Sequence, residues 1–163
     1  LRAEEGRVLS RWGDAGWGGM VRDDKQANQF RDDLIEAMAE MITERWDIDE
    51  RPTWLCCVPS LNHPELVPRF ARRLADRLGL VFVDAVQKVR DNGQQKFQQN
   101  RFYQCRNLDG AFKINEPLPD GHCFLIDDIV DSGWTLTVIA AKLQQAGSGK
   151  VYTVALASTS VND

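Results

Sequence analysis

Apolar residues follow two alternating patterns along this chain. In three segments they recur every third or fourth residue, which predicts amphipathic helices: residues 27–46, 66–78 and 135–146. Between and around them lie short, mostly apolar runs, which predict strands: residues 53–58, 80–83, 110–114, 122–127 and 151–156. Gly79 and Gly147 stand where the second and third helices are expected to end.

The order of these elements predicts the fold class. Strand, helix and strand over residues 53–83 form a βαβ unit, in which the two strands pair in parallel. We therefore expect an α/β domain, built as an open, mostly parallel twisted sheet flanked by helices. At 163 residues the chain is long enough for one core, so residues 1–163 are expected to form a single domain.

Two segments depart from the pattern. Residues 1–26 are charged and rich in glycine, so we expect an irregular lead-in whose tryptophans pack on the domain. Residues 87–106 are polar, basic and rich in glutamine, and a long polar insert in a compact domain is usually a lid, a binding loop or a disordered segment. Residues 87–114 are thus expected to form a small hood with a flexible loop.

Composition narrows the class of protein. A net charge of −4 argues against a surface that binds nucleic acid over its whole extent. A membrane span needs roughly 18 consecutive apolar residues, and the sequence has no such run. The four cysteines make neither a C-x-x-C pair nor a zinc spacing, so we expect reduced thiols and a cytoplasmic protein. The chain begins with Leu1 rather than Met, as expected either of a domain cut from a longer protein or of a processed one.

The most informative stretch is residues 123–137. An apolar run ends in Asp127 and Asp128, a short loop follows at residues 131–135, and then a helical pattern begins. Ligands bind at the carboxyl ends of strands in open α/β sheets, and a loop ahead of a helix offers N–H groups and a favourable dipole to a phosphate. The two carboxylates suit hydroxyl groups or a divalent cation. Together these features indicate a site for a sugar phosphate.

The same stretch resembles the phosphoribosyl-diphosphate signature of type I phosphoribosyltransferases, in which an apolar strand, two acids and a Thr-Thr-Gly-x-Thr loop precede a helix. The segment Arg106–Phe112 is similar to a stretch found in competence protein F-type members of that family. Residues 11–17 and 52–60 resemble a narrower group, the phosphoribosyltransferase-like region at the carboxyl end of some bacterial RecQ-type DNA helicases. The resemblance implies the type I phosphoribosyltransferase fold.

The resemblance also implies roles for single residues. In the family, the loop hydroxyls and N–H groups bind the 5-phosphate, here from Ser132, Gly133, Trp134 and Thr135. The two acids, here Asp127 and Asp128, hold the ribose hydroxyls, with Mg²⁺ nearby.

The remaining roles concern the diphosphate. The loop after the first strand, with Ser60 and Leu61, wraps the pyrophosphate, and Lys88 and Arg90 of the hood meet it as it leaves. Displacement of pyrophosphate builds negative charge on the leaving group, which Mg²⁺ and basic side chains stabilise.

Two residues depart from the family's loop. Asp131 stands where a threonine is usual, and it is either a general base for a nucleobase or the N-cap of the following helix. Trp134 stands where a small or basic residue is usual, and its side chain either lies over the site or packs outward.

Three functions remain open at this level. The first is a Mg²⁺-dependent transferase, with an unknown acceptor and Asp131 as its catalytic residue. The second is a module that binds phosphoribosyl diphosphate without turnover and regulates a RecQ-type helicase, through which DNA would be a partner. The third is a nucleic-acid contact domain that uses the basic, aromatic loop 87–106. Hood loops in this family often act across a dimer, which makes a homodimer a candidate assembly.

Overall fold

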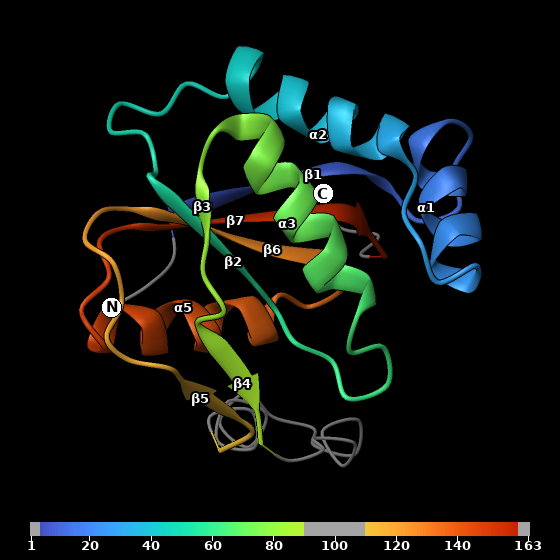
Figure 1. Cartoon of the computed structure of the whole chain (residues 1–163). Helices are drawn as coiled ribbons and strands as arrows, with labels where there is room; N and C mark the ends of the chain where they lie inside the picture. Colours follow the sequence, from blue (N-terminus) through green and yellow to red (C-terminus); the bar gives the residue numbers. More distant parts are fainter. Residues whose placement is uncertain (1–3, 90–109, 160–163) are drawn as a thin grey trace.

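The computed structural model describes residues 4–89 and 110–159, and it has one five-stranded sheet with helices on both faces (Figure 1). The sheet has the order β1-β7-β6-β2-β3, and every pair in it is parallel. Its strands are β1 (Glu4–Arg11), β2 (Trp54–Cys57), β3 (Val81–Phe82), β6 (Cys123–Val130) and β7 (Val151–Ser158). The helices are α1 (Trp17–Gln26), α2 (Asp32–Glu44), α3 (Leu66–Leu78) and α5 (Trp134–Gln145). The predicted α/β class is confirmed.

A second, smaller sheet lies apart from the first (Figure 1). It is an antiparallel pair of β4 (Val86–Lys88) and β5 (Phe112–Ile114). The two strands flank residues 90–109, which lie outside the described part of the chain and include most of the predicted flexible loop. The described ends of the hood thus form a short hairpin-like base.

The sheet separates two hydrophobic clusters because neighbouring positions of a buried strand face opposite sides. Helices α2 and α3 cover one face, and α5 covers the other (Figure 1). Cys57 packs toward α2 and α3, while the adjacent Cys56 packs toward α5. This is the packing role expected for the two thiols, and Cys56, Cys57 and Cys123 are all free. Within the described residues, no helix is both long and apolar enough to cross a membrane.

The central strand β6 has neighbours of unequal length. Its pairing with β2 ends at the Cys57–Ile126 pair, whereas its pairing with β7 continues to Val130 and Ser158. The segment from Asp127 to Val130 therefore extends beyond the end of β2, and β2 forms no pairs with it. Such a step at the carboxyl edge of a parallel sheet leaves room for a ligand.

The irregular lead-in predicted for residues 1–26 is wrong over most of its length. Residues Glu4–Arg11 form the edge strand β1, which pairs with β7, and residues Trp17–Gln26 form α1. The sequence did not predict β1 because this strand lies at an edge of the sheet and carries polar residues. It did not predict α1 because glycines interrupt the helical pattern. Trp12 packs against the core as expected, but Trp17 is 38% exposed.

The predicted helix at residues 27–46 begins later, at Asp32. Residues 27–31 instead form a turn in which Asn28 has a φ of 60°, a conformation that Asn tolerates better than most residues. The helix end predicted from Gly79 is confirmed. Helix α3 ends at Leu78, Gly79 adopts the left-handed conformation, and the N–H of Leu80 donates a hydrogen bond to the carbonyl of Ala75.

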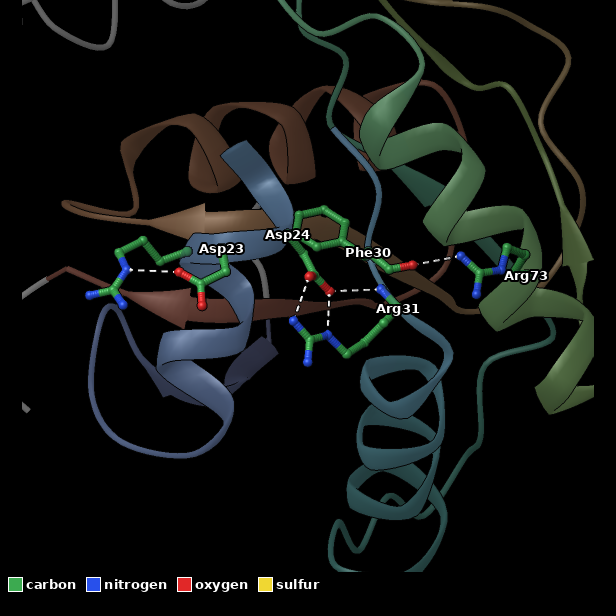
Figure 2. A network of polar contacts seen from close by, with 6 residues as sticks. Asp23, Asp24, Phe30, Arg31 and Arg73 are labelled. Atoms are coloured by element: carbon green, nitrogen blue, oxygen red, sulfur yellow. Dashed lines mark hydrogen bonds and ion pairs between the residues drawn. The ribbon is translucent and has the colours of Figure 1, made fainter. Parts of the chain in front are cut away.

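Polar contacts fix this turn between α1, α2 and α3 (Figure 2). Asp24 is only 7% exposed, and its carboxylate accepts hydrogen bonds from the Arg31 backbone N–H at 2.8 Å and from the Arg31 guanidinium at 2.9 and 2.7 Å. Arg73 of α3 donates to the Phe30 carbonyl at 2.8 Å and pairs with Asp32. The end of α1 is thus tied to the start of α2, and the start of α2 to α3.

Replacing Asp24 with Asn should weaken this junction and lower the free energy of unfolding at pH 7 by about 1–2 kcal/mol. The bonds from Arg31 lower the pKa of Asp24, although burial opposes them. The contribution is therefore complete above the ordinary value of 3.8 and is lost as the pH falls through the lower folded-state pKa.

Urea unfolding of both proteins at pH 7 and at several values below 3.8 checks this prediction. Asp23→Asn is the matched control, since that carboxylate is exposed and pairs with the exposed Arg22. A penalty for Asp24→Asn that stays constant down to low pH would contradict the assignment.

Candidate functional site

A cavity of about 240 Å³ lies at the step where β6 runs past β2. Five residues predicted from the sequence line it: Ser60, Lys88, Asp127, Asp128 and Thr135. They come from the loop after β2, from the hood strand β4, from β6 and from the first turn of α5. The fold thus brings four separate segments of the chain to one polar cavity.

The two carboxylates are held by the backbone of their own strand. Asp127 Oδ1 accepts a hydrogen bond from the N–H of Asp128 at 2.8 Å, and Asp128 Oδ1 accepts one from the N–H of Ile129 at 2.8 Å. Asp128 is buried, with 11% of its side chain exposed, whereas Asp127 is half-buried. These bonds leave each side chain with limited freedom at the cavity wall.

The pKa of Asp127 is raised well above its ordinary value. Loss of solvent around the carboxyl is the main cause, and the Asp128 carboxylate adds to it. The N–H of Asp128 and the positive charge of Lys25 act in the opposite direction. A carboxyl whose charge is disfavoured in this way is typical of a site that is completed by a ligand.

Lys25 also lines the cavity, although the sequence analysis did not predict it as a site residue. Its Nζ lies 2.9 Å from Asp128 Oδ2, and it comes from the last turn of α1. Nothing in the local sequence distinguishes Lys25 from other charged residues near it. Recognition of α1 as a helix packed at the end of the sheet would have been needed to find it.

The loop at residues 131–135 contributes less of the cavity wall than expected. Thr135 lines the cavity, but Asp131, Ser132, Gly133 and Trp134 do not. Asp131 and Ser132 are exposed, and the Ser132 hydroxyl accepts a long hydrogen bond, 3.4 Å, from the Trp134 N–H. The loop stands beside the cavity, at the entrance to α5.

Asp131 does not cap α5, so that alternative is wrong. The N-cap is Gly133, which has a φ of 85°, and Asp131 Oδ1 instead accepts a hydrogen bond from the Thr159 hydroxyl at 2.9 Å. Trp134 is partly buried against the core cluster on the α5 face. Its side chain packs away from the cavity, which it does not line.

The loop after β2 and the hood supply the remaining walls. Ser60 lines the cavity and its Oγ accepts a hydrogen bond from the N–H of His63 at 3.2 Å, while Leu61 is 53% exposed and does not line it. From the hood, Lys88 and Phe112 both reach the cavity, and the Lys88 ammonium lies 5.7 Å from the Phe112 ring centre. Arg90 lies outside the described residues.

The donor set does not fit a divalent cation held directly by Asp128. One of its oxygens accepts the Ile129 N–H, and the other contacts the Lys25 ammonium. Among residues 4–89 and 110–159, no group of three or more His, Cys, Asp and Glu side chains could hold a metal. Magnesium binding by Asp127 and Asp128 stays a prediction.

Comparison with models of protein families places most of the chain in a known family. The sequence model of the family described as phosphoribosyl transferase domain matches residues 26–161. No curated protein matches the chain. The match takes in the cavity's loop, acids, hood and α5, and it begins just after Lys25.

Because burial disfavours the charged form of Asp127, we expect this carboxylate to lower the stability of the fold while it serves ligand binding. A raised pKa means that stability present at low pH is lost as the pH rises through the folded-state value. Asp127→Asn keeps an oxygen for the Asp128 N–H but carries no charge, so it should raise the free energy of unfolding at pH 7 by about 1 kcal/mol.

Thermal and urea unfolding at pH 7, compared with the exposed control Asp120→Asn, measures the effect. A loss of stability in Asp127→Asn at pH 7 would mean that the ionised carboxylate is stabilising after all.

Proposed function

Because this chain belongs to the phosphoribosyl transferase domain family, we propose that its cavity binds phosphoribosyl diphosphate or a closely related sugar phosphate. The observation that carries the proposal is the meeting of paired acids, a helix entrance and two lysines in one cavity. The acids suit hydroxyl groups, and the helix entrance and lysines suit phosphates. A sugar with phosphates at both ends presents these groups in the matching order.

In this proposal each wall of the cavity binds one part of the ligand. Asp127 and Asp128 accept hydrogen bonds from the ribose hydroxyls at the centre of the cavity. The 5-phosphate lies at the entrance to α5, where Thr135 offers a hydroxyl and the first-turn N–H groups point outward. The diphosphate extends toward Ser60 and Lys88 on the opposite side.

Binding is favoured over transfer by the position of Asp131. A general base must lie within hydrogen-bond reach of the proton it removes. The Asp131 carboxylate is bonded to Thr159 and does not line the cavity. We therefore regard the catalytic role predicted for Asp131 as the weaker proposal and ligand binding as the main one.

Transfer of the phosphoribosyl group is the second candidate, and the hood favours it. Lys88 and Phe112 place a cation and an aromatic ring together at the cavity. A cation there would stabilise a departing diphosphate. The Phe112 ring is 4% exposed and lies behind the Lys88 ammonium at the cavity wall.

The helicase context remains a proposal that rests on the resemblance of residues 11–17 and 52–60. On that basis the domain would serve as an accessory, ligand-sensing part of a RecQ-type helicase. Helicase motifs in the reading frame upstream of Leu1 are the expected finding, and a start codon immediately before Leu1 would dismiss the idea. DNA contact through the basic, aromatic loop 87–106 is a further proposal from the sequence, and a homodimer is one from the resemblance to the family.

Calorimetry with phosphoribosyl diphosphate tests the main proposal. The double variant Asp127→Ala/Asp128→Ala should bind at least about 30-fold more weakly, because it loses the acceptors for two hydroxyls. Asp120→Ala, an exposed acid in the turn at the other end of β6, is the control and should bind as the wild type does. No binding by the wild type, or equal binding by the double variant, would refute the proposed site.

Release of pyrophosphate separates transfer from binding. With phosphoribosyl diphosphate present, we expect no release above the uncatalysed rate across a panel of nucleobases, since Asp131 is turned to Thr159. Release with any one base, reduced at least about tenfold by Lys88→Gln, would establish the second candidate instead.

A further inference from the structure

The ion pair between Lys25 and Asp128 joins the site to a part of the chain that the family match does not include. The matched residues begin at position 26, whereas Lys25 lies at the end of α1. Its Nζ is 2.9 Å from Asp128 Oδ2, and both residues line the same cavity. The lysine side chain is 29% exposed and that of Asp128 is 11% exposed, so the pair is largely shielded from solvent.

The backbone at Lys25 is fixed by its neighbours. Asp24, the preceding residue, is buried and bonded three times to Arg31, which starts α2 (Figure 2). The carbonyl of Lys25 accepts a hydrogen bond from the N–H of Asn28 at 3.1 Å. Arg73 in turn holds the Phe30 carbonyl from α3. The ammonium therefore reaches Asp128 from a rigid junction rather than from a loose terminus.

The ammonium occupies the side of Asp128 that a metal ion would need. Oδ1 already accepts the Ile129 N–H, so Oδ2 is the oxygen left for a cation, and Lys25 contacts it. A divalent ion approaching that oxygen would meet a positive charge at hydrogen-bond distance. Hydroxyl groups meet no such repulsion, because they can share the carboxylate with an ammonium donor.

We propose that Lys25 is a positioning residue that acts as the built-in cation of this site. It holds Asp128 as an acceptor for sugar hydroxyls and keeps divalent metal ions from the acid pair. The part about sugar hydroxyls rests on the proposed function, whereas the exclusion of metal ions concerns this chain alone.

The decisive experiment uses Mn²⁺ alone and follows free Mn²⁺ by electron paramagnetic resonance. Lys25→Gln exposes the two carboxylates and should bind Mn²⁺ at least about tenfold more tightly than the wild type. Lys25→Arg keeps the positive charge and should bind as weakly as the wild type. In Lys25→Gln/Asp128→Asn, the gained binding should disappear.

Lys150→Gln is the matched control, since this exposed lysine precedes β7 at the opposite end of the sheet. Circular dichroism establishes that each variant is folded. If Lys25→Gln loses structure, Lys25→Arg shows whether a folded variant that keeps the charge behaves as the wild type does. Equal Mn²⁺ binding by Lys25→Gln and the wild type would overturn the proposal. Gained binding that survives Asp128→Asn would overturn it as well.

A second measurement follows the sugar. Ribose 5-phosphate lacks the diphosphate that binds metal ions in solution, so its binding does not depend on a metal ion carried by the ligand. Its affinity for the wild type should change less than about threefold on adding EDTA, while Lys25→Gln should bind it more weakly by at least about tenfold without metal. Absence of wild-type binding would count against the proposed function, and the Mn²⁺ comparison would still decide the role of Lys25.

Discussion

The unequal lengths of the strands beside β6 are the constraint on which this molecule depends. Parallel pairing with β2 ends at Ile126, while pairing with β7 carries β6 on to Val130. The strand is therefore supported on one side and open on the other over the residues that carry the two acids. Had β2 continued, its backbone would fill the space of the cavity.

The cations that balance the two acids come from two segments that are distant in sequence. Asp127 and Asp128 are placed close together by β6, and their mutual repulsion would be costly without cations nearby. Lys25 arrives from α1, which the Asp24–Arg31 contact ties to α2, and Lys88 arrives from the hood. The N-terminal segment is thus part of the site's electrostatics, although it lies outside the family match.

The sequence predicted the features that depend on neighbouring residues. Continuous apolar runs marked the buried strands, and the stretch 123–137 placed the acids and Thr135 at a common site. Features that depend on distant contacts were missed. Asp131 has the local character of an N-cap, yet its tertiary partner Thr159 takes the carboxylate and Gly133 occupies the cap position. Lys25 could not be found because its partner lies far along the chain, and β1 because an edge strand needs little apolar pattern.

Hydrogen exchange with and without phosphoribosyl diphosphate tests the central claim most directly, since it locates the ligand on the backbone. The account predicts slower exchange at the amides of residues 132–135 and at those following β2, with little change along the outer face of α2. Protection centred elsewhere, or none at a concentration that saturates binding, would contradict the assignment of the cavity at the end of β6.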